Sequence, residues 1–159
     1  MTTNYDALIP TPFGALAISS HHMEISVELL SSIPENLPDH LHCDNEIVKQ
    51  IQTALMHYLD QASYEFNLNI KVQGTPFQQR VWQAISAIPV GETITYGELA
   101  KRVSSSPRAV ANACGANPLP VIVPCHRVVA KSSLGGFNRS RSTESLAIKQ
   151  WLLSHECAK

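Results

Sequence analysis

The part of the chain best suited to chemistry is a cysteine followed directly by a histidine and an arginine, at residues 125–127. A run of prolines and β-branched residues, 117–124, precedes it and predicts an extended, buried approach to the cysteine. A thiol acts as a nucleophile once it has lost its proton, which a nearby base or positive charge favours. His126 and Arg127 offer both groups, although neighbours on an extended chain point to opposite faces. These residues alone leave two interpretations open: a nucleophilic cysteine, or a buried structural cysteine beside a core histidine.

The elements predicted before this segment are helices, each with a start signal. A threonine N-cap, a proline and a glutamine at residues 75–78 predict a helix that runs through Ile88. Thr95 and Glu98 form a second capping box and predict a short helix that ends near Val103.

A third helix is predicted over residues 107–114, with Ser106 as its N-cap and Gly115 at its end. Together with the helix before it, this element predicts a helix-turn-helix. Such a pair binds DNA in some proteins and is ordinary helix packing in others, so the motif alone decides little.

The first half of the chain predicts a small unit of strands and one helix. Residues 25–29 and 66–70 alternate polar and apolar side chains, which is the pattern of strands. Residues 31–44 contain two prolines and predict a loop. An apolar stripe at helical spacing predicts an amphipathic helix, and it consists of Ile47, Ile51, Ala54, Leu55 and Tyr58.

A boundary is predicted at Gln73–Gly74, after the last of these strands. We therefore expect an α+β protein of two domains. A small sheet-plus-helix domain, 1–72, would pack on a mostly helical domain, 73–159, that holds the helix-turn-helix.

The charge of the chain changes sign near the same boundary. The net charge of −1 excludes a chain drawn to nucleic acid by its overall charge. Residues 1–70, however, hold one basic and nine acidic side chains, and residues 71–159 hold eleven basic and four acidic ones. This asymmetry, −8 against +7, indicates an anionic partner for the second half.

The composition, 44% hydrophobic and 16% charged, is that of a folded globular protein rather than a disordered one. No apolar run is long enough to span a membrane, and the N-terminus lacks the basic start of a signal peptide, so we expect a cytoplasmic protein with no membrane contact. The four cysteines show neither disulfide nor zinc-finger spacing. A histidine-rich set in the first half also follows no ligand spacing, so we expect solvated side chains rather than a metal site; it consists of His21, His22, His40, His42 and Cys43.

Several motifs of the second half resemble those of the O6-alkylguanine-DNA alkyltransferases. The resemblance covers residues 74–156, and the first half adds only T-P-F-G at 11–14, which is similar to the family's S-P-[LI]-G. The motifs are G-T-x-F-Q-x-x-V-W at 74–82, I-P-x-G-x-T-x-T-Y at 88–96, R-A-V at 108–110, N-P at 117–118, P-C-H-R-V at 124–128 and W-L-L-x-x-E at 151–156. Their shared order and spacing make the resemblance more specific than any one of them.

The resemblance implies DNA repair by transfer of an alkyl group from O6-alkylguanine to Cys125, with O4-alkylthymine left open as a second substrate. The damaged atom lies inside the base stack, so the nucleotide must first rotate out of the helix. Each molecule would act once, because the thioether is not hydrolysed back. The resemblance implies no cofactor. His126 resembles the base that takes the thiol proton through a water, and Glu156 the carboxylate that orients the imidazole. Asn117 resembles the hinge between the helix-turn-helix and the active-site strand.

Three residues of the helix-turn-helix would contact the DNA. Tyr96 and Arg108 resemble the pair that extrudes the nucleotide, with the arginine filling the vacated stack, and Thr95 lies beside them. The alternative for Arg108 is simple neutralisation of a phosphate. The family's recognition helix enters the minor groove and is rich in small residues, which Ala109, Ala111 and Ala113 match here.

The substrate pocket implied by the resemblance consists of Tyr96, Val128, Phe137 and Asn138. This chain departs from the family in two places. The turn between Tyr96 and Arg108 is about two residues shorter, and the loop after Phe137 is longer and lacks a glycine pair. Phe137 also lacks the hydroxyl of the family's tyrosine, so we expect an altered size preference. Arg139 and Arg141 on the longer loop are candidates for phosphate binding.

The expected partner is double-stranded DNA that contains O6-alkylguanine, bound by a monomer. Two other functions stay open beside this one. A non-catalytic lesion sensor resembles this family but lacks the nucleophile, which is present here as Cys125. A cysteine hydrolase or thiol oxidoreductase would need turnover or a resolving cysteine, and no motif places Cys114 or Cys157 for that role.

Overall fold

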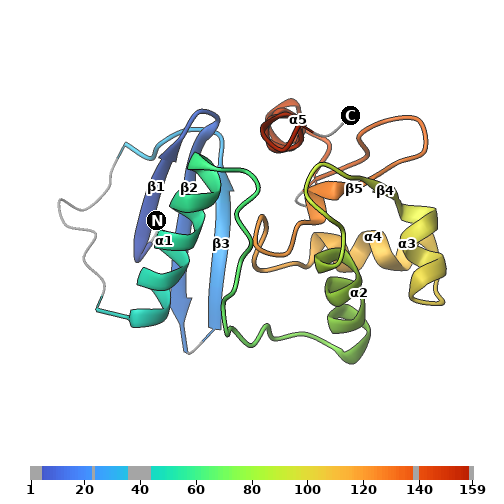
Figure 1. Cartoon of the computed structure of the whole chain (residues 1–159), viewed down its shortest axis with the longest axis horizontal. Helices are drawn as coiled ribbons and strands as arrows, with labels where there is room; N and C mark the ends of the chain where they lie inside the picture. Colours follow the sequence, from blue (N-terminus) through green and yellow to red (C-terminus); the bar gives the residue numbers. More distant parts are fainter. Residues whose placement is uncertain (1–4, 23, 36–43, 138–139, 158–159) are drawn as a thin grey trace. The chain divides into compact units, whose positions relative to one another are not determined.

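The computed structural model describes residues 5–22, 24–35, 44–137 and 140–157. The chain forms two compact units, Met1–Val72 and Gln73–Lys159 (Figure 1). No helix of the described residues is long and apolar enough to cross a membrane.

The first unit is an antiparallel sheet with one helix. Strands β1 (Ala7–Thr11), β2 (Gly14–His21) and β3 (Glu24–Leu30) follow one another in the sheet, and α1 (Glu46–Asp60) contacts β1 and β2. The predicted strand at 25–29 is confirmed, with Val27 and Leu29 buried on one face.

The tight turn between β1 and β2 requires a glycine. Gly14 has a φ of 143°, and a side chain there would meet the carbonyl oxygen of Leu30 at 2.1 Å. This turn is the segment that resembles the start of the family's sequences.

Two predictions for the first unit need correction. The buried stripe of α1 begins at Val48, while Ile47 is 42% exposed, because the helix starts at Glu46 and turns Ile47 outward. Residues 66–70 alternate between half-buried and exposed side chains as predicted, but they belong to no sheet of the described chain. Alternating burial of side chains requires only that one face of the segment be covered, whereas a β-strand also requires hydrogen bonds to the backbone of a neighbouring strand.

The second unit is mostly helical. Both capping boxes are confirmed: Thr75 caps α2 (Pro76–Ser86) and Thr95 caps α3 (Tyr96–Arg102). Helix α2 ends two residues before Ile88, because the chain turns ahead of the next proline. The carbonyl of Ile88 is therefore available for a bond outside the helix.

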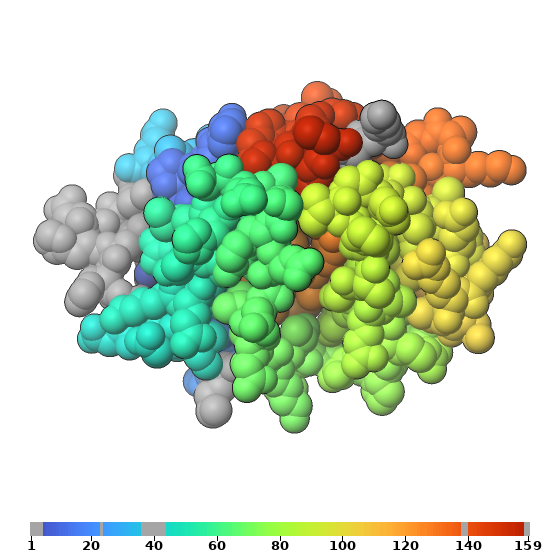
Figure 2. Space-filling model, in the orientation of Figure 1, coloured from blue at the N-terminus to red at the C-terminus, as the bar shows by residue number. Residues whose placement is uncertain are grey.

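The predicted helix-turn-helix is confirmed. Ser106 caps α4 (Pro107–Gly115), which packs on α3, and the indole nitrogen of Trp82 in α2 donates to the carbonyl of Ala113 in α4 at 2.9 Å. Residues 104–108, at the turn, are all exposed and lie at the surface of the molecule (yellow in Figure 2).

The segment that carries the cysteine differs from the extended chain that was predicted. The amide of Val123 donates to the carbonyl of Leu119 at 2.8 Å, and Val121 has a φ of 76°, so residues 119–123 form a turn. Positive φ is unfavourable for a β-branched residue, and the strain needs support from its surroundings. Beyond the turn lie the short helix η1 (Cys125–Arg127), β5 (Val128–Val129) and α5 (Thr143–His155). Strand β5 pairs in parallel with β4 (Ile94–Thr95).

Candidate functional site

A cavity of about 960 Å³ in the second unit brings together four of the predicted site residues. Cys125 lines it from η1, Tyr96 from α3, Arg108 from α4 and Phe137 from the loop before α5. The other lining residues are Pro107, Ala111, Asn112, Cys114, Gly115, Ala130, Gly135, Gly136, Ser140 and Arg141.

Asn117 fixes the turn that leads to the cysteine. Its side-chain amide donates to the carbonyl of Val123 at 2.8 Å, and its side-chain oxygen accepts the amide of Leu119 at 2.9 Å. The side chain thus closes the turn across its strained residue and joins the end of α4 to the start of η1. The backbone amide of Cys125 donates to the carbonyl of Val123 at 2.8 Å, which holds the cysteine to the same turn.

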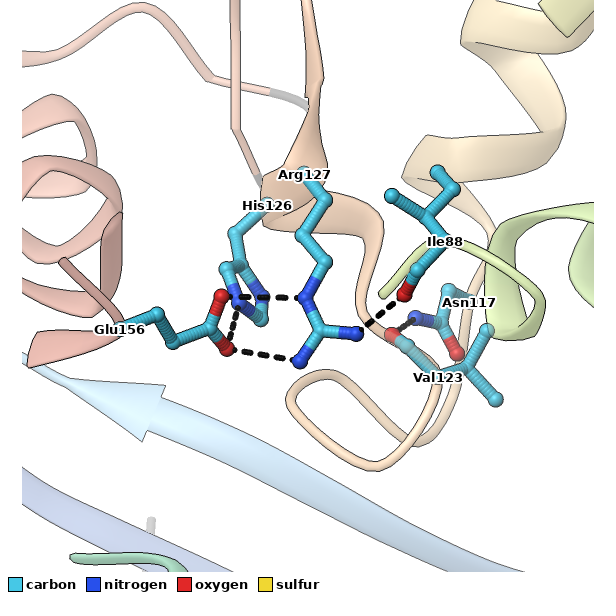
Figure 3. Close-up of polar contacts among 6 residues, drawn as sticks. All are labelled: Ile88, Asn117, Val123, His126, Arg127 and Glu156. Carbon is cyan, nitrogen blue, oxygen red and sulfur yellow. Dashed lines mark hydrogen bonds and ion pairs between the residues drawn. The ribbon is translucent and has the colours of Figure 1, made fainter. Parts of the chain in front are cut away.

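His126 and Glu156 form a buried pair. The Nε2 atom of His126 lies 2.7 Å from Oε1 of Glu156, at the C-terminal end of α5 (Figure 3). A carboxylate at this distance accepts, so Nε2 carries the imidazole proton and Nδ1 is left as the proton acceptor. Nδ1 is buried and has no hydrogen-bond partner among the described residues. The alternative of a solvated helix end for Glu156 is wrong, because Glu156 is only 5% exposed.

Arg127 completes this cluster and was not among the predicted site residues. Its Nε donates to Oε2 of Glu156 at 3.0 Å and its Nη2 to Oε1 at 2.9 Å, a two-bond pairing of guanidinium and carboxylate. Its Nη1 donates to the carbonyl of Ile88 at 2.6 Å (Figure 3). Arg127 therefore joins η1 to the end of α5 and to the chain beyond α2.

The electrostatics of the cluster favour a carboxylate and a neutral imidazole. Burial would raise the pKa of Glu156, but hydrogen bonds from His126 and Arg127 outweigh it and lower the pKa to about 2. Burial lowers the pKa of His126, although Glu156 opposes that effect. Burial also raises the pKa of the Cys125 thiol, with a hydrogen bond from Asn117 and the charge of Lys149 acting in the opposite direction.

Lys149 is a second residue that the sequence did not identify. Its side chain is fully buried in α5, and its ammonium donates to the carbonyls of Val128 at 2.8 Å, Leu134 at 2.5 Å and Gly136 at 2.9 Å. Burial lowers the pKa of Lys149 to about 8. The three bonds tie the loop that lines the cavity, residues 130–137 (the cavity loop), to β5, the strand that follows the cysteine.

Tyr96 forms one wall of the cavity against this loop. Its hydroxyl donates to the carbonyl of Gly136 at 3.4 Å, and a side chain at position 135 would come within 2.9 Å of its ring. Burial, with the nearby Cys114 and Cys125, raises the pKa of Tyr96 to about 12, so the phenol stays protonated and able to donate.

Other predicted site residues take supporting positions. Thr95 caps α3, and Val128 is buried in β5 beside Ile94; neither lines the cavity. Of the three small residues of the recognition helix, Ala113 is buried against the protein, so only Ala109 and Ala111 reach its outer side.

Cys114 lines the same cavity as Cys125, although no sequence motif placed it there. Burial raises its pKa to about 12, so Cys114 keeps its proton at neutral pH. Signals for Cys114 and Lys149 were absent from the sequence because both residues acquire their surroundings from distant segments.

Some predicted residues lie outside the described part of the chain: Asn138, Arg139, His40, His42 and Cys43. Arg141, which is described, is exposed at the cavity. No group of three or more histidine, cysteine, aspartate or glutamate side chains suited to a metal occurs in the described ranges.

Comparison with known proteins gives consistent matches. Residues 76–158 match the family "6-O-methylguanine DNA methyltransferase, DNA binding domain". The constitutive methylated-DNA–protein-cysteine methyltransferase of Bacillus subtilis is 35% identical over 161 residues, which cover 96% of this chain and 95% of that protein. Mycobacterium tuberculosis O6-methylguanine methyltransferase has a TM-score of 0.73 at 33% identity, over 94% of this chain and 90% of its own. The complex of M. tuberculosis OGT with DNA gives 0.71 at the same identity and coverage.

Proposed function

The chain belongs to the O6-methylguanine-DNA methyltransferase family, and on that basis we propose that Cys125 is its alkyl acceptor. The protein is a methylated-DNA–protein-cysteine methyltransferase, which binds DNA and repairs it by transferring an alkyl group to cysteine. Cys125 is supported as the acceptor by its place in the P-C-H-R-V motif, at the cavity and beside the His126–Glu156 pair.

The proposed substrate is guanine alkylated on O6, with O4-alkylthymine as a second substrate to be tested. The sulfur of Cys125 attacks the alkyl carbon, an S–C bond forms and the bond between that carbon and O6 breaks. The electron pair of the broken bond stays on the guanine, which takes up the proton that the thiol loses. The product thioether is stable in water, so each molecule repairs one lesion.

His126 acts as the base for this step. Its Nδ1 has no partner in the described part of the chain and carries the lone pair, while Nε2 donates to Glu156. The imidazole is therefore oriented to accept the thiol proton through a water. Glu156 then stabilises the imidazolium that forms.

The cavity is large enough to admit an extruded base, and its lining supports that role. Cavities for small ligands measure roughly 300–1,000 Å³, and this one has a volume of about 960 Å³. Tyr96 and Phe137 supply aromatic walls, and Arg108 lies exposed on α4 where it can enter the vacated stack. Entry of α4 into the minor groove and action as a monomer are part of the same proposal.

The observation that carries this proposal is the buried His126–Glu156 pair next to a cavity cysteine. Incubation with an oligonucleotide that contains O6-methylguanine, followed by mass spectrometry of both partners, tests it. We expect one methyl group per protein, located on Cys125 and absent in Cys125→Ser. The matched control is Cys114→Ser, which changes a thiol of the same cavity and should leave the transfer intact. Methylation of Cys114 or repeated turnover would contradict the proposal, and binding without transfer would favour the lesion sensor.

A further inference from the structure

The backbone around Arg141 is fixed on both sides, although its side chain is exposed. On one side, Phe137 and Ser140 exchange two backbone hydrogen bonds, of 2.8 and 2.9 Å. On the other side, the amide of Ser142 donates to the hydroxyl of Ser140 at 3.0 Å, and the hydroxyl of Ser142 caps α5 by accepting the amide of Ser145. Arg141 is therefore held between the wall of the cavity and the first turn of α5.

The side chain of Arg141 runs along the end of the cavity loop and lines the cavity. Its Cγ atom lies 3.6 Å from the point at which a side chain at Gly136 would begin. Burial raises the pKa of Tyr96, and the charge of Arg141 acts in the opposite direction, so the guanidinium lies near enough to influence the Tyr96 hydroxyl. That hydroxyl donates to the carbonyl of Gly136, so both observations place the cation at the same wall of the cavity.

The charge of Arg141 is available to a ligand. In the part of the chain that the structure describes, its guanidinium forms neither a hydrogen bond nor an ion pair. The charged residues among the described lining of the cavity are Arg108 and Arg141, and no carboxylate accompanies them. Lys149, the other nearby cation, already donates to three carbonyls. The cavity therefore presents two arginines and suits an anionic ligand.

An extruded nucleotide would bring its anionic groups to the mouth of this cavity. The base stays joined through its sugar to the two phosphates that flank it, and these remain in the strand outside the cavity. Arg108, if it enters the vacated stack, is no longer free to bind them. A guanidinium matches a phosphate well, because it donates two parallel hydrogen bonds to the oxygens.

We propose that Arg141 binds one of the two phosphates that flank the extruded nucleotide and so holds the damaged base in the cavity. The inference rests on the proposed function, since it requires a nucleotide to enter the cavity. It divides the work between the two arginines: Arg108 fills the space that the base has left, and Arg141 retains the nucleotide at its new position.

A set of oligonucleotides with one uncharged phosphate each tests this contact. Every phosphate within three nucleotides of an O6-methylguanine is replaced in turn by a methylphosphonate, and the rate of alkyl transfer is measured in single turnover at low DNA concentration. With unmodified DNA, Arg141→Gln should lower the rate by about tenfold, the effect of one hydrogen bond to a charged group. In the unmodified protein, one flanking methylphosphonate should cause a loss of similar size.

The combination of the two changes decides the proposal. If Arg141 binds that phosphate, Arg141→Gln and the flanking methylphosphonate together should lower the rate no further than either change alone. Arg141→Lys, which keeps the charge, should retain part of the effect of the methylphosphonate. The matched control is Lys131→Gln, which removes one charge from an exposed position of the cavity loop that does not line the cavity. Its loss should add to that of the methylphosphonate at every position.

Losses that add for Arg141→Gln at both flanking phosphates would overturn the proposal, since a change in the shape of the loop gives that result. A non-additive loss at a more distant phosphate would also overturn it, because the contact would then lie away from the extruded nucleotide. An absence of any transfer from unmodified DNA to the unmodified protein would refute the proposed function instead. Normal transfer with additive losses would refute only the role of Arg141.

Discussion

The ammonium of Lys149 lies 5.9 Å from the centre of the Tyr96 ring. One buried cation therefore contacts the aromatic wall of the cavity and also holds three carbonyls of the cavity loop and β5. The shape of the cavity depends on a helix that follows the cysteine by many residues.

The substitution Lys149→Met tests this dependence. A methionine fills similar space but donates no hydrogen bonds, so the loop should lose its attachment. We expect the rate of alkyl transfer at low DNA concentration to fall about tenfold, the effect of one hydrogen bond of about 1.4 kcal/mol. Single-turnover kinetics against DNA concentration measure it. Lys131→Met, at an exposed position of the same loop, is the control, and an equal loss there would indicate a general effect of charge.

Glu156 predicts a stability that falls in acid. Its folded pKa of about 2 lies below the ordinary value near 4.5, so the unfolded chain binds a proton first as the pH falls. The contribution is complete above pH 4.5 and is lost as the pH approaches 2. Between pH 5 and pH 3 we expect a loss on the order of 2 kcal/mol in the free energy of unfolding. Urea titrations at several pH values give the free energy of unfolding of the unmodified protein and of Glu156→Gln. If this free energy falls equally steeply with decreasing pH in both proteins, Glu156 is excluded as the cause of the acid sensitivity.

Asn117→Ala should weaken the turn before the cysteine. Two buried hydrogen bonds are lost, each worth about 1 kcal/mol, so we expect the free energy of unfolding to drop by about 2 kcal/mol. Alkyl transfer should slow as well, since the position of Cys125 follows from the turn. Asn112→Ala, at an exposed position of α4, is the comparison for stability, and a similar drop in both variants would contradict a special role for Asn117.

Arg108→Ala should affect DNA binding and repair together. Loss of one contact to a phosphate lowers the slope of log affinity against log salt by about one. If Arg108 also fills the vacated stack, transfer at saturating DNA falls too. Arg80→Ala is the matched control, because the guanidinium carbon of Arg80 lies 5.4 Å from the centre of the Phe77 ring in its own helix. A changed slope with unchanged saturating transfer would leave only the phosphate contact.

Local signals explain what could be predicted from the sequence. The starts of α2, α3 and α4 each depend on a cap within three residues, Thr75, Thr95 and Ser106, and all three were predicted. The buried face of α1 was harder to predict than its presence. Ile47 and Val48 are both apolar, and only the residue at which the helix starts decides which of them is buried.

The rest could not be predicted because it depends on distant partners. Arg127 meets Glu156 from 29 positions away, and Lys149 meets the carbonyl of Val128 from 21. The turn before the cysteine could not be predicted either, because its β-branched residues favour an extended chain. The two hydrogen bonds of the Asn117 side chain stabilise the turn, a conformation that such residues otherwise avoid.

The indole of Trp82 donates to the carbonyl of Ala113 in the helix that carries Arg108, and the ring of Trp151 stacks on His155 beside Glu156, with 4.7 Å between ring centres. These are the two tryptophans of the chain. Each is attached to an element that borders the site, one on the side of the recognition helix and one on the side of the base. Their fluorescence emission therefore reports on both sides of the site without an attached dye.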